Sequence, residues 1–180
     1  MEIIKTEIEG LLIIKPKVFE DERGYCYESY KEQAYQQNGI AMNFVQDNQS
    51  KSKRGVLRGL HFQNPPFAQG KLIRVLSGCV FDVAVDIRKD SETYGQWHSV
   101  ILSEDNKLQY WIPPGFAHGF LTLENDTILS YKCTELYNKE AEGSIRWNDP
   151  DLKISWSYYD PILSDKDKDA TLFKDFVSLF

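Results

Sequence analysis

The chain has 180 residues, of which 42% are hydrophobic and 27% are charged, and these proportions are ordinary for a soluble globular protein. Its formal net charge is −6, so the surface as a whole does not attract nucleic acid. An anionic ligand would therefore have to be held by a local cluster of basic side chains.

Cysteine usage and the first residues bear on the cellular compartment. Three cysteines, Cys26, Cys79 and Cys133, are odd in number and widely spaced, which favours buried thiols in a reducing compartment over a disulfide framework. The first ten residues, MEIIKTEIEG, are acidic where a secretory signal is basic and then apolar, and no apolar run reaches membrane-spanning length. We expect a cytoplasmic protein without a membrane or nucleic-acid partner.

Ten short runs with strand-like composition follow one another along the chain. They are separated by turn residues such as Ser77-Gly78 and Pro113-Pro114-Gly115. The predicted strands fall within residues 10–16, 25–30, 43–48, 55–62, 71–76, 79–87, 98–103, 108–113, 117–123 and 127–136. Many short strands at nearly regular spacing are typical of an antiparallel β-sandwich or barrel.

The clearest alternation lies within residues 79–87. Phe81, Val83, Val85 and Ile87 face one way, and Asp82, Ala84 and Asp86 face the other. We expect the first face to pack in the core and the second to face water or a cavity.

Helix is scarce in this pattern. Residues 29–39 begin with Ser29 and Glu32 at the spacing of a capping box and stop at Asn38-Gly39. The tail, residues 163–176, offers a second short helix with Ser164 as its N-cap. No repeat or linker divides the chain, so we expect one mainly β domain over residues 1–180 with a few short helices.

The run VLRGLHFQ, residues 56–63, interrupts a strand pattern with polar groups. Arg58 and His61 are three positions apart, and alternation along a strand would place them on opposite faces. Gly59 lies between them and permits a bulge or bend that brings both to one side. Two interpretations stay open here: an ordinary strand histidine, or a base beside an arginine that holds an anion.

Other basic residues lie near this run. Arg58, Lys71 and Arg74 fall on two successive predicted strands, and Arg23 precedes another. Lysine and arginine are also common on solvated strand edges, so composition alone does not decide between a binding cluster and a strand edge.

The three histidines raise the possibility of a metal site. PPGFAHG, ending in His118 and Gly119, fits the second half of a metal-binding cupin motif, but the first half wants His-x-His and the chain has His61-Phe62-Gln63. His98 would have to supply the missing ligand, since a transition-metal site needs at least three. Without a metal, His61 is free to act as a base.

Several long motifs resemble one enzyme family. They are DERGYCYESY, FVQDNQSKSKRGVLRGLHFQ, AQGKLIR, GCVFDVAVDIRKDSETYGQW, YWIPPGFAHGF, EGSIRWNDPDL and LSDKDKDA, in that order and nearly from end to end. In these stretches the sequence resembles the dTDP-4-dehydrorhamnose 3,5-epimerases. The resemblance implies a cupin-type jelly roll that epimerises C3 and C5 of dTDP-4-dehydro-6-deoxy-D-glucose on the way to dTDP-L-rhamnose, with neither metal nor other cofactor.

The same resemblance implies roles for individual residues. His61 is the base, Tyr131 is the proton donor on the opposite face of the sugar, and Asp167 orients the base. Tyr137 stacks on the thymine ring. The substrate-binding positions are Arg23, Glu28, Gln46, Asp47, Asn48, Arg58, Lys71, His118, Glu142 and Lys166.

The chemistry suits these residue types. Protons at C3 and C5 are both adjacent to the C4 ketone, so removal of either leaves an enolate. An imidazole, with an ordinary pKa of about 6.5, is a good base for that step. The cation of Lys71 suits the enolate oxygen, the phenol of Tyr131 stays protonated until it donates, and the guanidinium of Arg58 pairs with the diphosphate.

Other functions are weighed against this one. An epimerase that acts at C3 only, a metal-dependent cupin enzyme and a non-catalytic sugar-nucleotide binder are the alternatives. A nicotinamide enzyme lacks its Gly-x-Gly-x-x-Gly fingerprint. The family resemblance also implies a homodimer, to which strand addition by the N-terminal residues could contribute, and in which Arg23 and Glu28 could reach the partner's site.

Overall fold

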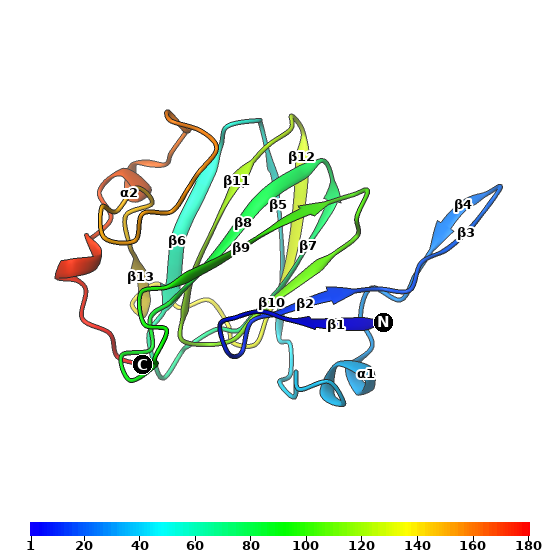
Figure 1. The fold of residues 1–180 in the computed structure, drawn as a ribbon, viewed down its shortest axis with the longest axis horizontal. Helices are drawn as coiled ribbons and strands as arrows, with labels where there is room; N and C mark the ends of the chain where they lie inside the picture. Colours follow the sequence, from blue (N-terminus) through cyan, green and yellow to red (C-terminus); the bar gives the residue numbers. More distant parts are fainter.

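The computed structural model describes residues 1–180 and consists of two antiparallel sheets packed face to face (Figure 1). In strand order, the six-stranded sheet comprises β1 (Glu2–Lys5), β2 (Leu12–Lys15), β10 (Gln109–Ile112), β7 (Lys71–Ser77), β12 (Thr127–Cys133) and β5 (Gln46–Ser52). The five-stranded sheet comprises β13 (Glu142–Ser144), β6 (Leu57–Gln63), β11 (Phe116–Thr122), β8 (Cys79–Asp86) and β9 (Trp97–Ser103). The predicted mainly β fold is confirmed.

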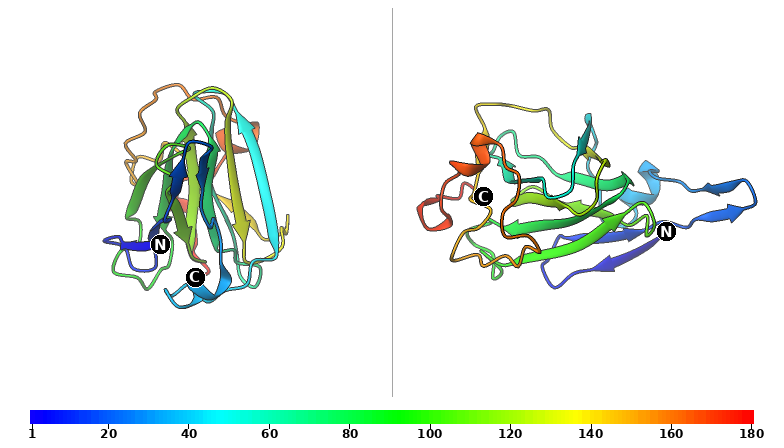
Figure 2. Two further views of the ribbon diagram at one scale, coloured as in Figure 1. Left: turned by 90° about the vertical axis from the view of Figure 1, so that its right-hand side faces the viewer. Right: turned by 90° about the horizontal axis from the view of Figure 1, so that it is seen from above.

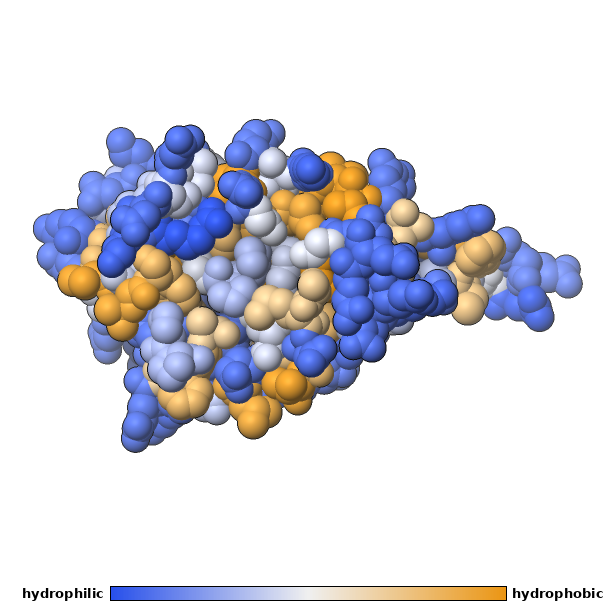
Figure 3. All heavy atoms as spheres, turned by 90° about the horizontal axis from the view of Figure 1, so that it is seen from below, coloured by the Kyte–Doolittle hydropathy of each residue, from blue (hydrophilic) through white to orange (hydrophobic).

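A two-stranded hairpin stands apart from both sheets. It is formed by β3 (Phe19–Asp21) and β4 (Gly24–Cys26) and projects from the end of the sandwich that carries the N-terminus (Figures 1 and 2). All six strand residues are exposed, and Phe19 and Tyr25 each leave more than half of their surface to solvent. In the space-filling view the arm at the right is mostly hydrophilic with a small apolar patch (Figure 3). Residues 18–27 are called the arm below.

The core has two layers because β8 is covered on both sides. Val80 and Ala84 pack between the sheets, whereas Val83 and Val85 pack on the outer face against the C-terminal segment. The predicted alternation of β8 is therefore present, but neither face is open to water. Asp82, on the inward face, is fully buried.

The short helices fit the prediction only in part. Helix α1 (Glu32–Gln36) follows Lys31 as its N-cap and has no side-chain cap, so the capping box predicted for Ser29 is wrong. The carbonyl of Ser29 instead accepts hydrogen bonds from the Tyr35 hydroxyl and the Gln109 amide, at 3.2 and 2.8 Å. These tertiary contacts fix the chain before the helix begins.

The second helix begins after the predicted cap, Ser164, but covers only part of the predicted residues 163–176. Helix α2 (Asp165–Lys168) begins after Ser164, whose hydroxyl accepts from the backbone N–H of Asp167 at 3.2 Å. A single 3₁₀ turn, η1 (Phe173–Asp175), follows it. None of the helices has the length and apolar character needed to cross a bilayer.

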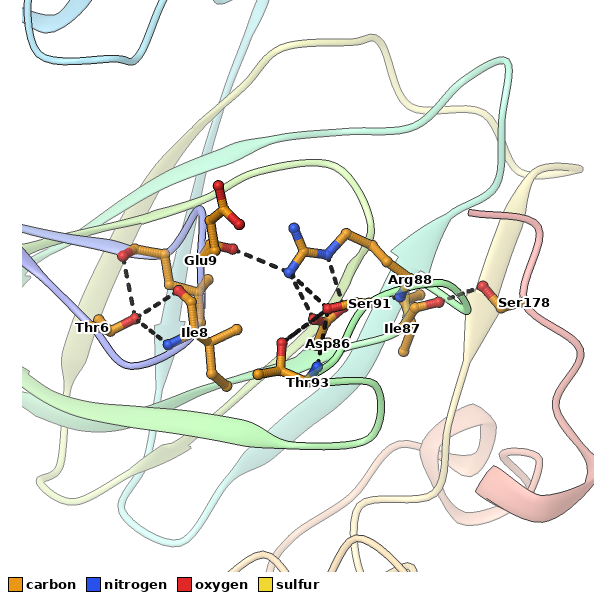
Figure 4. Close-up of polar contacts among 10 residues, drawn as sticks. Thr6, Ile8, Glu9, Asp86, Ile87, Arg88, Ser91, Thr93 and Ser178 are labelled. Atoms are coloured by element: carbon orange, nitrogen blue, oxygen red, sulfur yellow. Dashed lines mark hydrogen bonds and ion pairs between the residues drawn. The ribbon is translucent and has the colours of Figure 1, made fainter.

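The C-terminal segment is tied to the five-stranded sheet on both sides of α2. Before the helix, the carbonyl of Ile162 accepts from the backbone N–H of Leu57 at 3.0 Å. After it, the Ser178 hydroxyl donates to the carbonyl of Ile87, a contact seen at the right of Figure 4. As a result α2 lies beside β6, where the site residues are found (Figure 1).

A buried carboxylate organises the turn that follows β8. Asp86 accepts hydrogen bonds from the guanidinium of Arg88 and from the hydroxyls of Ser91 and Thr93 at 2.6–2.9 Å (Figure 4). Arg88 also donates to the carbonyl of Glu9 at 3.1 Å. Burial raises the pKa of Asp86, but these hydrogen bonds outweigh it and leave the pKa below its ordinary value. The charge-assisted network holds the connection between β1 and β2 against the sandwich.

Candidate active site

A cavity of two adjoining lobes opens between the sheets. The first lobe, about 430 Å³, is lined by residues of β5, β6, β7, β11 and β12 and by the segment that leads into α2. The second lobe, about 300 Å³, is lined mainly by polar side chains from β5, β6 and the loops near them. His61, Lys71 and Tyr131 line both lobes, so these three residues lie where the lobes meet.

His61 and Asp167 form a close pair in the first lobe. His61 comes from β6 and Asp167 from the first turn of α2, and Nε2 of the imidazole lies 2.5 Å from Oδ1 of the carboxylate. Burial raises the pKa of Asp167, but the hydrogen bonds from His61 and Ser164 and the charge of Lys166 outweigh it and hold the pKa below its ordinary value. An ionised carboxylate only accepts hydrogen bonds, so Nε2 of His61 carries a proton and Nδ1 is left free to accept one.

The bend predicted at Gly59 brings Arg58 and His61 to the same lobe. Both line it although they are three residues apart, and the pairing of β6 with β11 shifts register between His118 and Phe120. Gly59 has a φ of +141°, and a Cβ built on it would lie 2.4 Å from the Cα of Gly119. Only glycine allows the two backbones to approach so closely.

Tyr131 and Lys71 face the pair from the other sheet. They lie on the neighbouring strands β12 and β7 of the six-stranded sheet, whereas His61 belongs to the five-stranded one. Burial raises the pKa of the Tyr131 phenol and lowers the pKa of the Lys71 ammonium. Tyr131 therefore stays protonated at neutral pH, and Lys71 is a stronger proton donor than an exposed lysine.

His118 is buried at the wall of the first lobe and has a carboxylate behind it. Its Nε2 lies 2.9 Å from Oδ1 of Asp82, which is fully buried on the inward face of β8. Burial is the largest influence on both groups: it lowers the pKa of His118 and raises the pKa of Asp82. Asp82 was not among the predicted site residues: the alternation of β8 put its side chain on the face expected to meet water or a cavity, and the structure instead buries it completely.

Besides Lys71, the second lobe collects four more of the predicted binding residues. Gln46 and Asn48 reach it from β5, together with Tyr137 and Glu142. The hydroxyl of Tyr137 donates to Glu142 at 3.1 Å, and Lys166 forms an ion pair with the same carboxylate. Burial raises the pKa of Glu142, but Lys166 and the tyrosine hydroxyl together lower it by more, so the pKa lies below its ordinary value.

Three predicted binding residues lie away from the cavity. The side chain of Asp47 is on the outer face of β5 and pairs with Lys132 at 2.9 Å, because only alternate residues of a strand share a face. Arg23 lies on the exposed arm and pairs with Asp21 at 2.6 Å, and Glu28 is exposed near its base. Within one chain, none of these side chains lines either lobe.

Two further residues, considered above as a binding residue and a metal ligand, also lie outside the cavity. Arg74 contacts the hydroxyl of Tyr27 at 3.4 Å and lines neither lobe. Nδ1 of His98 lies 3.1 Å from the hydroxyl of Tyr110, and His98 does not join His61 and His118. No group of three or more His, Cys, Asp or Glu side chains is arranged to hold a metal ion, so the ligand set that the metal alternative requires is not formed.

Fold and site together define a class of protein. A jelly-roll sandwich carries a histidine on one sheet, paired with a carboxylate of α2, and a lysine and a tyrosine on the other sheet, around one cavity. This is an acid–base enzyme, equipped to remove a proton from one side of a ligand and to return a proton from the other side.

The chain belongs to the dTDP-4-dehydrorhamnose 3,5-epimerase family, whose model matches residues 5–175. The enzymes of this family are isomerases that act on nucleotide sugars. The resemblance drawn from the motifs, the cupin-type β fold and the enzyme class are therefore confirmed.

Individual relatives agree over nearly the whole chain. The dTDP-4-dehydrorhamnose 3,5-epimerase of Salmonella typhimurium is 55% identical over 174 residues, which are 96% of this chain and 95% of the relative. The crystal structure of dTDP-6-deoxy-D-glucose-3,5-epimerase from Legionella pneumophila, in complex with dTDP-4-keto-L-rhamnose, has a TM-score of 0.94 and 52% identity, covering 98% of this chain and 94% of that one. A 3′-monoepimerase from Streptomyces bikiniensis, in complex with dTDP-quinovose, has a TM-score of 0.88 and 32% identity, covering 93% and 85%.

Proposed function

We propose that this chain inverts C3 and C5 of dTDP-4-dehydro-6-deoxy-D-glucose to give dTDP-4-dehydro-L-rhamnose, with His61 as the base and Tyr131 as the acid. One observation carries the assignment: His61, which is paired with Asp167 of α2, and Tyr131 come from opposite sheets and line the same cavity. A sugar between them would have a base on one face and an acid on the other. Inversion at a carbon needs that arrangement.

The first step is removal of a proton next to the ketone. Nδ1 of His61 takes the proton from C3 or C5, and the electron pair of the C–H bond moves into an enolate whose charge rests on the C4 oxygen. The carboxylate of Asp167 stabilises the imidazolium that forms. Lys71 is suited to the enolate oxygen because burial lowers its pKa and makes its proton easier to share.

The second step returns a proton to the opposite face. Tyr131 donates the proton of its hydroxyl to the same carbon, and the ketone re-forms with the centre inverted. Burial raises the pKa of Tyr131, so the phenolate that remains is a strong base and is reprotonated from solvent. The proton on His61 leaves to solvent, which restores both groups.

Binding is assigned to both lobes. Arg58 and His118 line the first lobe with the catalytic residues, and we place the diphosphate near Arg58. Gln46, Asn48, Tyr137 and Glu142, with Lys166 beside them, provide the second lobe for the nucleoside. Tyr137 offers its ring for stacking on thymine.

Other parts of the proposal concern the whole chain. Residues 1–180 act as one domain in the cytoplasm, and the enzyme works without a cofactor or metal. Two chains form a homodimer in which Arg23 and Glu28 reach the partner's cavity, in keeping with an arm that its own sandwich leaves exposed. The side chain of Asp47 has no place in this scheme.

The alternative is an epimerase that acts at C3 only. The 3′-monoepimerase structure shares 32% identity with this chain, against 52% for the 3,5-epimerase structure. Product analysis after incubation with the dTDP-linked 4-keto sugar separates the two activities, because a C3-only enzyme leaves C5 uninverted.

Solvent deuterium separates the two proton-transfer roles. We expect His61→Asn to abolish both turnover and the uptake of deuterium at C3 and C5. We expect Tyr131→Phe to lower net epimerisation by about 10²–10⁴-fold, the usual effect of a lost general acid, while some deuterium still enters without inversion. The measurement is mass spectrometry and NMR of the sugar after incubation in D₂O.

Two results would contradict the assignment. A Tyr131→Phe enzyme that inverts both centres at close to the wild-type rate would show that another group is the acid. A His61→Asn enzyme that still exchanges the protons at C3 and C5 would show that His61 is not the base.

A further inference from the structure

Three glutamine side chains hold one loop at the rim of the second lobe. The loop comprises residues 134–141, connects β12 to β13 and carries Tyr137; it is called the Tyr137 loop below. Gln69 donates to the carbonyl of Glu135 at 2.7 Å, Gln63 donates to the carbonyl of Leu136 at 3.2 Å, and Gln46 accepts from the N–H of Tyr137 at 2.9 Å. Gln63 also accepts from the N–H of Asn138 at 2.8 Å.

These contacts satisfy four successive residues of an otherwise irregular segment. No neighbouring strand pairs with these backbone groups. Glutamine side chains from distant strands and loops form the hydrogen bonds instead. Backbone groups that are fixed in this way lose the freedom that an exposed loop normally keeps. Tyr137 is 56% exposed as a residue, yet its backbone is held on both sides of its Cα.

Gln63 makes the densest set of contacts. It is buried, with 4% of its surface exposed, and its amide nitrogen also donates to the carbonyl of Phe67 at 2.7 Å. An amide is the side-chain group that supplies donors and an acceptor at once without a charge, and here both are occupied by backbone. Gln63 stands where a metal-binding cupin motif has its second histidine, so this position holds a loop in place of an ion.

The loop in turn fixes the ring that faces the lobe. The hydroxyl of Tyr137 donates to Glu142, on β13, at 3.1 Å. Its backbone is tied to β5 and to β6, so three strands determine where the ring stands. A ring that is already in place costs less entropy when a base stacks on it.

We propose that Gln63 and Gln69, with Gln46, are positioning residues that set the affinity for the nucleoside end of the substrate by holding Tyr137 in place. The inference rests on the proposed function, in which Tyr137 stacks on the thymine ring. It adds two residues, Gln63 and Gln69, that the family resemblance did not assign, and it gives them a role in binding and none in proton transfer.

The test is a pair of mutant cycles in the full-length enzyme. Gln63→Met and Gln69→Met keep the side-chain length and remove the amide, and each is made alone and combined with Tyr137→Ala. Isothermal titration with dTDP measures affinity, and initial rates give KM and kcat. Gln49→Met is the matched control, because Gln49 lies on the outer, exposed face of β5 and makes no contact with the Tyr137 loop.

We expect Tyr137→Ala to weaken dTDP binding about tenfold, as loss of a stacking ring usually does. Each glutamine variant should weaken it about three- to tenfold, the effect of one or two lost neutral hydrogen bonds, and should raise KM with little change in kcat. On the Tyr137→Ala background the same changes should have no further effect. Gln49→Met should bind dTDP as the wild type does.

Each other outcome has a defined meaning. Equal weakening in both backgrounds, or none in either, overturns the positioning role while the assignment of Tyr137 stands. An unchanged affinity in Tyr137→Ala alone overturns the stacking role and the inference together. Because Gln63 is buried, a thermal melt is recorded for each variant, and Gln69→Met, at a half-buried position, provides the reading if Gln63→Met does not fold.

Discussion

Two carboxylates beside histidines behave differently at this site. Asp167 stands on a one-turn helix, next to Lys166 and a partly exposed imidazole, and its pKa is lowered. Asp82 is sealed inside the sandwich behind His118, and its pKa is raised. The same pairing of residue types therefore gives an ionised carboxylate at the base and a more weakly acidic one behind the binding histidine.

Replacement of Asp167 tests the proposal that this carboxylate orients His61. An amide in Asp167→Asn cannot stabilise the imidazolium that forms when His61 takes a proton, so kcat should fall by about 10²–10⁴-fold while dTDP affinity stays close to wild type. Stopped-assay kinetics and titration calorimetry measure the two quantities. A loss of dTDP affinity with kcat retained would contradict this role.

The same variant has a pH signature in stability. The pKa of Asp167 is lower in the folded chain than in the unfolded one, so its contribution to the free energy of unfolding is fully present above the unfolded value of about 3.9. The contribution is lost as pH falls through the folded pKa. The stability difference between wild type and Asp167→Asn, measured by urea denaturation, should therefore shrink below about pH 4.

At the scale of elements, strand β6 shows how a backbone detail assembles the site. Regular alternation would separate Arg58 from His61, and the close approach of Gly59 to Gly119 removes that separation. Gly59 combines a positive φ with a neighbour that leaves no room for a side chain. The geometry of two site residues therefore depends on a glycine that touches no substrate.

Gly59→Ala should unfold the enzyme much more easily than a glycine replacement in open space. A strained φ and a backbone clash together should lower the free energy of unfolding by at least about 3 kcal/mol. Gly39 also has a positive φ, +91°, but a Cβ there would meet nothing within 4 Å, so Gly39→Ala should cost only about 1–2 kcal/mol. Urea denaturation measures the loss of stability in both variants. Equal losses would show that the close approach to Gly119 does not add to the cost of a side chain at residue 59.

The elements that could be predicted are those whose signal is local. Alternation and turn residues located the main strands, and Ser164 marked the start of α2 because its cap is formed within one turn. The start of α1 was mispredicted because the contacts of Ser29 come from Tyr35 and Gln109. Only the strand predicted at residues 25–30 overlaps the arm, because the two strands of the arm pair with each other and join neither sheet.

The site was predictable to a similar extent. Long motifs located His61, Tyr131 and Asp167, which the fold brings to one cavity. Alternation alone could have placed the side chain of Asp47 outside it, since three successive strand residues cannot share a face. The roles of Gln63 and Gln69 were beyond reach, because their partners are backbone groups of a loop more than 60 residues away.

At the scale of the whole molecule, a single chain gives the exposed arm no role at its own cavity. An isolated two-stranded hairpin is marginal in water, yet this one leaves aromatic surface exposed and carries Arg23 away from the cavity. The protein is acidic overall, and a diphosphate needs local positive charge. A second copy that receives the arm would bury the aromatic side chains and add a guanidinium to the cavity at the same time.

Mixed dimers test this arrangement. Chains with Arg23→Ala and chains with His61→Asn should each be weakly active or inactive alone at substrate concentrations below KM. In a heterodimer, the chain with Arg23→Ala keeps an intact His61 and receives an intact arm from its partner, so one of the two cavities is complete. Random pairing of equal amounts makes half of the dimers mixed, and coexpression should therefore restore about a quarter of the wild-type activity. Tagged coexpression followed by an activity assay measures the gain. If Arg23 served the cavity of its own chain, every cavity would lack one of the two residues, and no activity would be regained beyond the average of the two variants.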